Sequence, residues 1–359
     1  MQQETVTIIL PTYEEAESLP SLIEAIDEVR NTSLQNLKLI VVDDKSQDGT
    51  EELIAKLQLD WVRLIVRRRE KGLSTAVLRG LEEAESDYCI VMDADGSHPA
   101  SVVPQMVKAL IDGADFTVGS RYVLGGSTED GWGVLRWINS KVATIMARPF
   151  TTVKDPMSGF LGMRRSTFLS AEKLDPVGYK IGLELIVKCG CKNVVEVPID
   201  FRTRQLGESK LTLRVQWEYL QHVIRLLRFA YPALVSFFTF ATVGLSGLGI
   251  YILSSMITTS YISPQWIAIT VAIWIAMTWN FVWDRKWAFW DSRDKSIISQ
   301  YIGFVLVCSV GAIANYFVTT SIIGQPHGVP LAALVGGLSG SVVGILFNFI
   351  FNRIIVFRR

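Results

Sequence analysis

Cysteine is scarce in this sequence, with four residues in 359, and their spacing excludes a disulfide framework. Cys189 and Cys191 are separated by a single residue, which is too close for a C-x-x-C metal or redox pair. Cys89 and Cys308 lie in apolar or mixed surroundings. Free thiols of this kind predict a chain that works in a reducing compartment.

Net charge is absent as well, because 35 Lys and Arg residues balance 35 Asp and Glu residues. The overall charge therefore predicts no nucleic-acid partner. The sequence also lacks G-x-G-x-x-G and G-x-x-x-x-G-K-[ST], which disfavours a dinucleotide-binding fold and a P-loop hydrolase. A phosphate ligand has to be held by a metal ion and basic side chains instead.

Charged residues are missing altogether from two long stretches, residues 233–283 and 296–352. A helix needs ~20 consecutive apolar residues to cross a membrane, and each stretch is long enough for two such helices. Soluble proteins rarely contain uncharged stretches of this length. We expect transmembrane spans near residues 233–257, 264–284, 298–323 and 329–352.

Lys and Arg are concentrated on one side of these spans. The connection after the second span and the C-terminal tail contain Arg285, Lys286, Arg293, Lys295, Arg353, Arg358 and Arg359. The turns at residues 258–264 and 324–330 contain none. Because cytoplasmic loops are enriched in Lys and Arg, we expect both termini and the N-terminal domain to face the cytoplasm. The polar first residues predict no secretory signal peptide.

The charged N-terminal part alternates between short apolar runs and segments with helical spacing. Strands are predicted at residues 6–10, 37–42, 62–66, 88–92, 115–119 and 194–201, and helices at 14–29, 50–57, 74–84 and 101–111. Repeated strand–helix units predict a mainly parallel sheet with helices on both faces. Ligands of such sheets bind outside the carboxyl ends of the strands.

Two carboxylates follow one of these apolar runs directly. Asp93 and Asp95, one residue apart at the carboxyl end of a buried strand, suit a hard divalent cation that also holds a diphosphate. Helix capping would explain Asp95 or Ser97 separately, but it does not explain the pair. Asp95 is the main metal ligand, and Asp93 is expected to share the cation or to lie against a ribose. His98 fits a site residue and a plain turn residue equally well.

The ends of the first two strands carry further polar candidates. Tyr13 can stack on a base, and Glu15 can accept a hydrogen bond from the ring edge of that base. The alternative is that Pro-Thr-Tyr forms only an ordinary turn. Asp44 can bind a base or a ribose. Ser46 and Asp48 have a structural alternative, which is to cap the helix that follows.

These residues belong to a longer series of motifs. The series consists of P-T-Y at 11–13, V-D-D-x-S-x-D-G-T at 42–50, K-G-L at 71–73, D-A-D-G-S-H-P at 93–99, G-S-R-Y at 119–122, K-D-P-M-S-G-F at 154–160 and G-E-S-K at 207–210. Over residues 5–230 it resembles the family 2 glycosyltransferases that make dolichyl- or polyprenyl-phosphate mannose. The resemblance implies an α/β GT-A fold, a nucleotide-sugar donor and a divalent cation, Mg²⁺ or Mn²⁺.

The resemblance also implies roles for individual residues. Donor contacts would fall on Pro11, Tyr13, Glu15, Val42, Asp44, Asp93, Ala94, Asp95, Ser97, Arg121, Lys180, Arg204 and Lys210. Metal ligation would fall on Asp93, Asp95 and Ser97. Many members have Gln at the position of Ser97, and the shorter serine leaves room for a water molecule between it and the cation.

The acceptor chemistry agrees with this assignment. A lipid phosphate is already an anionic nucleophile at neutral pH, so the site needs no general base. It needs cations that bring two anionic reactants together. The catalytic candidates are Asp95, Arg121, Arg136, Arg204 and Lys210. A solvated surface charge is the alternative for any single arginine, first of all for Arg136. The polar segment 207–210 is expected to close over the donor.

An amphipathic helix is predicted between the charged and the uncharged parts. Its apolar stripe and flanking arginines suit the headgroup region of a membrane, near a lipid phosphate. A linker helix packed on the catalytic domain is the alternative. The expected division is a cytoplasmic GT-A domain at residues 1–211, an interfacial helix at 212–232 and a four-helix transmembrane domain at 233–359.

The transmembrane part contains an internal repeat. The pattern N-F-x-x-[DN]-R-x-x-x-F occurs at residues 280–289 and 348–357, each time at the end of a span, which predicts a duplicated helix pair. This part resembles the GtrA-like four-span family, which accompanies such transferases and is proposed to move lipid-linked sugars. No charged residue marks a pathway mid-span, so anchoring and self-association as a homo-oligomer are favoured over transport.

These features predict an inverting, metal-dependent transferase that moves mannose from GDP-mannose to dolichyl or polyprenyl phosphate at the cytoplasmic face of a membrane. Two alternatives stay open. One is a polyprenyl-phosphate glucosyltransferase that uses UDP-glucose, and the other is a lipid-sugar flippase or scaffold with an inactive catalytic domain. A processive polysaccharide synthase is disfavoured, because Q-x-x-R-W does not occur.

Overall fold

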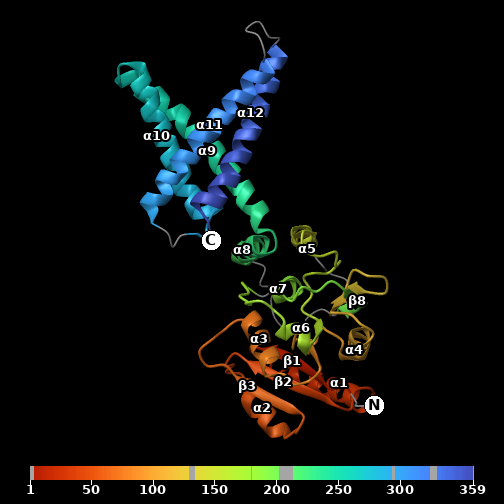
Figure 1. Ribbon diagram of the computed structural model, residues 1–359. Coiled ribbons are helices and arrows are strands. Elements are labelled where there is room, and N and C mark those ends of the chain that lie inside the picture. The colour runs from red at the N-terminus through yellow and green to blue at the C-terminus, as the bar shows by residue number, and fades with distance from the viewer. Residues whose placement is uncertain are drawn as a thin grey trace. The chain divides into compact units, whose positions relative to one another are not determined.

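The chain forms two compact units, Met1–Leu226 and Leu227–Arg359. The computed structural model describes residues 4–128, 134–178, 180–201, 213–292, 296–323 and 330–358. Figure 1 follows the chain from the red strands and helices of the first unit to the blue helices at its C-terminal end.

The first unit is built around a seven-stranded sheet. Its strands are β1 (Val6–Thr12), β2 (Leu37–Asp43), β3 (Val62–Val66), β4 (Tyr88–Val91), β5 (Phe116–Ser120), β7 (Leu161–Arg164) and β8 (Val194–Pro198). They lie in the order β3-β2-β1-β4-β7-β5-β8. Only β7 runs antiparallel to its neighbours among these strands. The predicted, mainly parallel sheet is thus confirmed. A separate parallel pair is formed by β6 (Ser127–Thr128) and β9 (Asp200–Phe201).

Helices cover both faces of this sheet, because alternate residues of a strand point to opposite sides. On β1, Ile8 and Leu10 pack with α1 and α4, whereas Ile9 packs with α3 and α7 on the other face. The helices of this unit are α1 (Leu19–Thr32), α2 (Thr50–Leu57), α3 (Leu73–Glu83), α4 (Val103–Ile111), α5 (Val134–Ala147), α6 (Arg165–Leu169), α7 (Ile181–Lys188) and the start of α8 (Leu213–Ala230).

The first helix begins at Leu19, later than the sequence pattern predicts. The backbone N–H groups of Glu14 and Ala16 donate to Ser46 Oγ and Asp48 Oδ2, each at 2.8 Å. These hydrogen bonds tie the segment to the chain after β2 instead of to a helical turn. The prediction of a helix over residues 14–29 is therefore wrong at its N-terminal end. Strand β7 and helices α5 to α7 are additional elements that the pattern does not predict.

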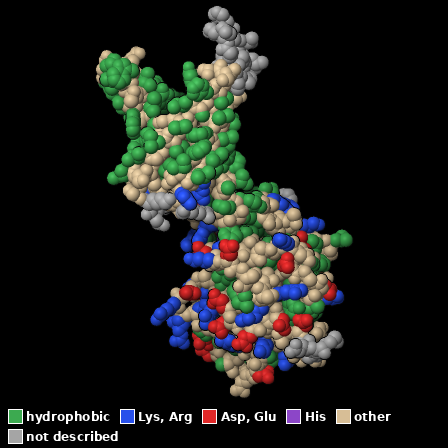
Figure 2. Space-filling model, in the orientation of Figure 1, with side chains coloured by type: hydrophobic (Ala, Val, Ile, Leu, Met, Phe, Trp, Pro, Cys, Tyr) green, Lys and Arg blue, Asp and Glu red, His purple; other side chains and the backbone are tan. Residues whose placement is uncertain are grey.

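Four long apolar helices make up most of the second unit. They are α9 (Pro232–Tyr261), α10 (Gln265–Trp283), α11 (Ile297–Ile323) and α12 (Pro330–Phe351). Each expected span overlaps one of these helices, and by length and composition all four can cross a membrane. Figure 2 shows hydrophobic side chains along the length of these helices, interspersed with uncharged polar groups and backbone. Within this unit α9 packs along α10 and α11 along α12, and the two pairs diverge from one end (Figure 1).

The two helix pairs end alike, as the repeated motif predicts. Helix α10 continues into a π-helical turn at Asp284–Ala288, and α12 continues into one at Asn352–Val356. The last residues of the two motif copies, Phe289 and Phe357, stack on each other with ring centroids 4.4 Å apart. The duplicated ends therefore pack together at the point where the pairs meet.

Each motif copy begins with an asparagine that is seated on a glycine of the preceding helix. Asn280 lies against Gly247 of α9, and Asn348 lies against Gly311 of α11. A Cβ atom on either glycine would overlap the side-chain amide of the asparagine. Small residues at such points allow two helix backbones to approach closely.

We expect Gly247→Ala and Gly311→Ala each to lower the free energy of unfolding of the membrane unit by about 1–3 kcal/mol, because overpacking displaces neighbouring groups. Thermal unfolding in detergent measures the change. Gly244→Ala and Gly249→Ala are matched controls in α9, since a Cβ there would meet no atom within 4 Å. Equal losses in the controls would contradict the role of the asparagine–glycine contacts.

Candidate active site

A cavity of about 800 Å³ lies at the carboxyl ends of β1, β2, β4 and β5. Residues that directly follow these strands line it, because the carboxyl ends of parallel strands share one edge of the sheet. The lining includes the following predicted donor residues: Pro11, Tyr13, Glu15, Asp44, Asp93, Ala94, Asp95, Arg121 and Lys180. The convergence that the sequence predicts at the strand ends is therefore present in the fold.

Other predicted residues are placed differently. Val42 and Ser97 are buried and do not belong to the lining of the cavity. Arg204 and Lys210 lie outside the described residues. The backbone of Arg136 belongs to α5, but its side chain also lies outside the description. Their predicted roles stay predictions.

Asp93 and Asp95 lie on the turn after β4 and differ in their surroundings. Asp95 is 8% exposed, and its Oδ1 accepts hydrogen bonds from the backbone N–H of Ser97 at 3.0 Å and from Ser97 Oγ at 2.5 Å. The side chain of Asp93 is 26% exposed. It lies over Gly159, where a Cβ atom would come within 2.9 Å of Asp93 Oδ1. The turn presents two carboxylates to one cavity, and Asp95 is the more tightly held.

This pair fits a hard divalent cation, since carboxylate oxygens are the ligands that Mg²⁺ and Mn²⁺ prefer. Within the described part of the chain, no group of three or more His, Cys, Asp or Glu side chains could hold a metal ion. A cation here would therefore complete its coordination with oxygens of the bound ligand and water. The hydroxyl of Ser97 donates to Asp95 and supports that carboxylate, and the predicted contact of Ser97 with the cation stays a prediction.

Arg121 follows β5 and is held in one orientation by a buried carboxylate. Its Nε and Nη2 donate to the two carboxylate oxygens of Asp155 at 2.7 and 2.8 Å. Burial alone would lower the pKa of Arg121, but the hydrogen bonds and the charge of Asp155 outweigh burial and raise the pKa. The guanidinium is therefore a fixed positive charge in the wall of the cavity.

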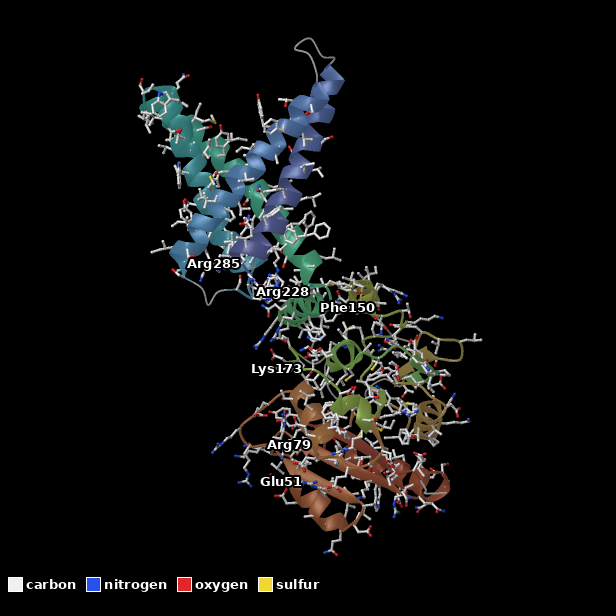
Figure 3. The ribbon with its side chains drawn as sticks, viewed as in Figure 1. Glu51, Arg79, Phe150, Lys173, Arg228 and Arg285 are labelled. Carbon is white, nitrogen blue, oxygen red and sulfur yellow. The ribbon has the colours of Figure 1, made fainter. Side chains whose placement is uncertain are left out.

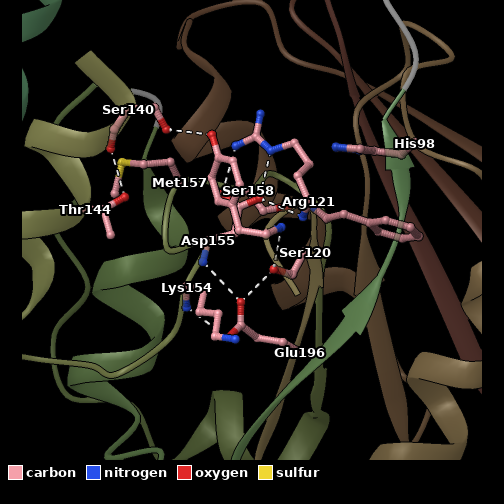
Figure 4. Close-up of polar contacts among 12 residues, drawn as sticks. His98, Ser120, Arg121, Ser140, Thr144, Lys154, Asp155, Met157, Ser158 and Glu196 are labelled. Carbon is pink, nitrogen blue, oxygen red and sulfur yellow. Dashed lines mark hydrogen bonds and ion pairs between the residues drawn. The ribbon is translucent and has the colours of Figure 1, made fainter. Parts of the chain in front are cut away.

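Asp155 is fixed in turn by Glu196 (Figure 4). Glu196 Oε1 accepts hydrogen bonds from Ser120 Oγ at 2.7 Å and from the backbone N–H of Asp155 at 3.1 Å. Its Oε2 accepts from the backbone N–H of Lys154 at 2.8 Å. This network joins β5, β8 and the segment before β7. The sequence gives Asp155 and Glu196 no individual role, although Asp155 lies within the K-D-P-M-S-G-F motif.

Asp44 lines the cavity, but its carboxylate already accepts hydrogen bonds from other residues of the chain. Its carboxylate accepts hydrogen bonds from Arg67 Nε at 2.6 Å and from the backbone N–H of Gly72 at 2.7 Å. Arg67 also donates to Thr75 Oγ1 at 2.8 Å. A base or ribose at Asp44 would share the carboxylate with these donors. Sequence reasoning misses Arg67, because it is the first of three consecutive arginines that resemble a solvated charge run.

The two capping candidates after β2 have separate partners. Asp48 Oδ1 accepts from the backbone N–H of Thr50 at 3.2 Å and from Thr50 Oγ1 at 2.8 Å. Asp48 therefore binds the first residue of α2, whereas the N-cap position itself is Gly49, which forms no side-chain cap. Ser46 Oγ instead donates to Asp43 Oδ1 at 2.5 Å. Neither residue lines the cavity.

Aromatic and basic groups flank the acidic turn. Tyr13 is 44% exposed, and Lys71 Nζ lies 5.2 Å from the centre of its ring. The exposed ring is available to stack on a base. Lys180, the N-cap residue of α7, donates from Nζ to the backbone carbonyl of Met157 at 3.0 Å. Both lysines line the cavity and add positive charge to it.

The same cavity continues onto an apolar wall formed by α5 and α8. Its lining there includes Val142, Ala143, Met146, Val215 and Tyr219. The Tyr219 hydroxyl donates to the backbone carbonyl of Ala143 at 2.9 Å and joins the two helices. These two helices also expose large apolar side chains: Ile138, Val142, Ile145 and Trp217. One cavity thus combines a charged end and an apolar end.

A mainly parallel sheet with acidic and basic groups at its strand ends, on a chain with four apolar helices, defines a GT-A-like glycosyltransferase with a membrane unit. The model of glycosyl transferase family 2 matches residues 7–169, and the model of the GtrA/DPMS transmembrane domain matches residues 239–357. The chain belongs to the dolichol-phosphate mannosyltransferase group of family 2 glycosyltransferases and is a multi-pass membrane protein.

Three relatives carry this assignment. A dolichol-phosphate mannosyltransferase of Pyrococcus furiosus is 36% identical over 97% of this chain and 98% of its own. One of Mycosarcoma maydis is 38% identical over 70% of this chain and 88% of its own. A polyprenol monophosphomannose synthase of Mycolicibacterium smegmatis is 34% identical over 57% of this chain and 80% of its own.

Proposed function

We propose that this chain transfers mannose from GDP-mannose to a polyprenyl or dolichyl phosphate with inversion at the anomeric carbon. The observation that carries the proposal is the single cavity with two chemically different ends. Carboxylates and cationic side chains at the strand ends suit a nucleotide sugar, and the apolar wall of α5 and α8 suits a lipid. The names of the relatives, dolichol-phosphate mannosyltransferase and polyprenol monophosphomannose synthase, support mannose as the sugar and a polyprenyl-type phosphate as the acceptor.

The reaction is a single displacement. An oxygen of the lipid phosphate attacks the anomeric carbon as the bond to the diphosphate breaks, and the nucleoside diphosphate leaves with the bonding electrons. The nucleophile is already ionised, so no side chain has to remove a proton. The task of the protein is to hold two anions close together. Arg121, with its orientation set by Asp155, is the cation best placed to do this among the described residues.

Asp93 and Asp95 would hold the divalent cation, with Ser97 supporting Asp95. When bound, such a cation neutralises the charge that develops on the departing diphosphate. The carboxylates have a second effect of their own. Without the cation they would repel the diphosphate, so nucleotide binding should depend on added Mg²⁺ or Mn²⁺.

We further propose that the catalytic unit and both termini face the cytoplasm. Arg228 and Arg285 lie at one end of the membrane unit, near the π-helical turn that ends α10 (Figure 3). Arg228 lies 5.0 Å from the ring centre of Trp290. Arg353 pairs with Asp291 at 2.7 and 2.8 Å. Positive side chains at this end favour its placement at the cytoplasmic surface.

A cysteine-labelling experiment tests this orientation. Ser260 is exposed near the opposite end of α9, so Ser260→Cys should react with a membrane-impermeant maleimide added to intact cells. Ser21→Cys, exposed on α1, should react only after lysis, and the wild-type chain supplies the background. The reverse pattern would place the catalytic unit on the outer side.

The activity is tested with membranes that contain the protein, polyprenyl phosphate and Mg²⁺ or Mn²⁺. Labelled GDP-mannose should give an organic-soluble, labelled lipid, whereas labelled UDP-glucose should give none. Transfer from UDP-glucose alone would support a glucosyltransferase instead. Absence of transfer from either donor, in membranes with folded protein, would support a scaffold with an inactive catalytic unit.

A further inference from the structure

His98 closes the acidic turn after β4 and takes part in none of the steps above. It is 3% exposed and contributes to the lining of the cavity. Its Nδ1 accepts a hydrogen bond from the backbone N–H of Asp93 at 3.0 Å. A ring nitrogen that accepts carries no proton, so the neutral imidazole has its proton on Nε2. That nitrogen lies 3.9 Å from Asp93 Oδ2.

Two aromatic rings fix the plane of this imidazole. Phe160, which is fully buried, stacks on it with centroids 5.0 Å apart and an interplanar angle of 17°. Phe201 meets it edge-on at 5.6 Å. The Phe201 ring also lies 5.1 Å from the guanidinium carbon of Arg121. One aromatic side chain therefore contacts both the histidine beside the acidic turn and the main cation of the site.

Asp93 is confined from the opposite side as well. Its carboxylate lies over Gly159, where a Cβ would approach Oδ1 and Oδ2 to 2.9 and 3.0 Å. Gly159 directly precedes the Phe160 that stacks on His98. The backbone of Asp93, its carboxylate and the imidazole are thus held by one small group of residues.

We infer that His98 is a positioning residue that sets the direction in which the Asp93 carboxylate enters the cavity, and that Phe201 couples this direction to the position of Arg121. The inference rests on the proposed function, because its consequence is tighter binding of the nucleotide sugar and its cation. In this arrangement the hydrogen bond to Nδ1 fixes the backbone of Asp93 at 3.0 Å, and Nε2–H faces Oδ2 of the Asp93 carboxylate from 3.9 Å without a direct hydrogen bond. The structure gives His98 no role as a base.

The test compares three variants by titration calorimetry with GDP-mannose and Mn²⁺, in the absence of lipid acceptor. His98→Phe keeps a planar ring but loses both nitrogens, and we expect its Kd for the nucleotide sugar to rise about tenfold or more. His98→Asn retains an acceptor near the position of Nδ1 and should recover part of the affinity. His98→Gln retains only a donor near Nε2 and should recover less than His98→Asn.

A stability control separates positioning from general loss of structure. Val107, on α4, is 1% exposed and packs in the core on the face of the sheet that α1 covers. Val107→Ala should lower the unfolding temperature at least as much as the histidine variants while leaving the Kd unchanged. If Val107→Ala weakens binding as much as His98→Phe does, the effect is structural and the inference fails.

Nitrogen-15 NMR of the wild-type imidazoles gives a test that needs no variant to fold. The spectrum must show His98 as the neutral Nε2–H tautomer, and the signal must move when GDP-mannose and Mn²⁺ bind. The Nδ1–H tautomer, or a signal unchanged by ligand, would overturn the inference. If wild-type protein binds no nucleotide sugar at all, the proposed function itself fails. If it binds normally and His98→Phe binds equally well, only the role of His98 fails.

Discussion

Replacing Asp95 by alanine should abolish sugar transfer while the chain still folds and inserts into membranes. Loss of a group that holds a catalytic cation removes several kcal/mol of transition-state stabilisation, which corresponds to about a 1000-fold or greater fall in rate. Of the two carboxylates on the turn after β4, Asp95 is the more tightly held, through Ser97. The measurement is transfer of labelled mannose into lipid, normalised to the amount of folded protein.

Two companion variants make this result specific. Asp95→Asn keeps an oxygen that Ser97 can reach but removes the charge, and it should be nearly as inactive as Asp95→Ala. Asp112, 61% exposed at the end of α4, gives a matched control, because Asp112→Ala removes a carboxylate that does not line the cavity and should retain full activity. Wild-type turnover by Asp95→Asn would refute a charge-based role.

Replacing Asp155 by asparagine should have the second large effect, although this residue does not line the cavity. Asp155 is fully buried, and the Arg121 side chain is 10% exposed. Breaking a buried ion pair by removing one partner costs about 3–5 kcal/mol of stability. The freed guanidinium also loses its fixed direction, and misplacement by about 1 Å can reduce a rate about 100-fold. Chemical unfolding and the transfer assay measure the two effects.

The control for this prediction is a second buried ion pair in the same unit. Lys188 Nζ lies 2.7 Å from Glu184 Oε1 on α7. Lys188→Met should lower the free energy of unfolding but should change transfer by much less than Asp155→Asn. Arg121→Lys should resemble Asp155→Asn, because a lysine keeps the charge but cannot form the forked contact. Equal losses of transfer in Lys188→Met and Asp155→Asn would show that activity follows stability alone.

The sequence predicts the parts of the fold that have local signals. Apolar runs followed by turn residues mark β1 to β5, and a helix needs only an apolar face at the correct spacing. The uncharged stretches at residues 233–283 and 296–352 identify the membrane helices without reference to packing. The repeated N-F-x-x-[DN]-R-x-x-x-F motif identifies the duplicated helix ends, because each copy forms the same structure at the end of its helix pair.

The rest depends on contacts between residues far apart in the sequence. Strand β7 has four residues, lies between β4 and β5, and runs against both, which no local pattern specifies. Helix α1 begins late because Ser46 and Asp48 compete for the backbone of residues 14–16. Long-range hydrogen bonds of this kind override helical spacing.

The residues of the candidate site divide in the same way, into those with a local sequence signal and those that depend on contacts with distant residues. The acidic turn is predicted because it directly follows an apolar run, and Arg121 is predicted because it belongs to the G-S-R-Y motif at 119–122. Asp155 and Arg67, which hold Arg121 and Asp44, are not predicted, since each acts through a partner distant in the sequence. Helix α5 also has no sequence signal strong enough to separate it from its surroundings, yet it forms part of the apolar wall.

A structure of the protein with GDP-mannose and Mn²⁺ tests the central claim most directly. We expect the diphosphate in the cavity at the strand ends, beside Arg121 and Lys180, with the cation bound to Asp95 and to oxygens of the diphosphate. A nucleotide bound elsewhere on the chain, or a cation that contacts neither Asp93 nor Asp95, would contradict it.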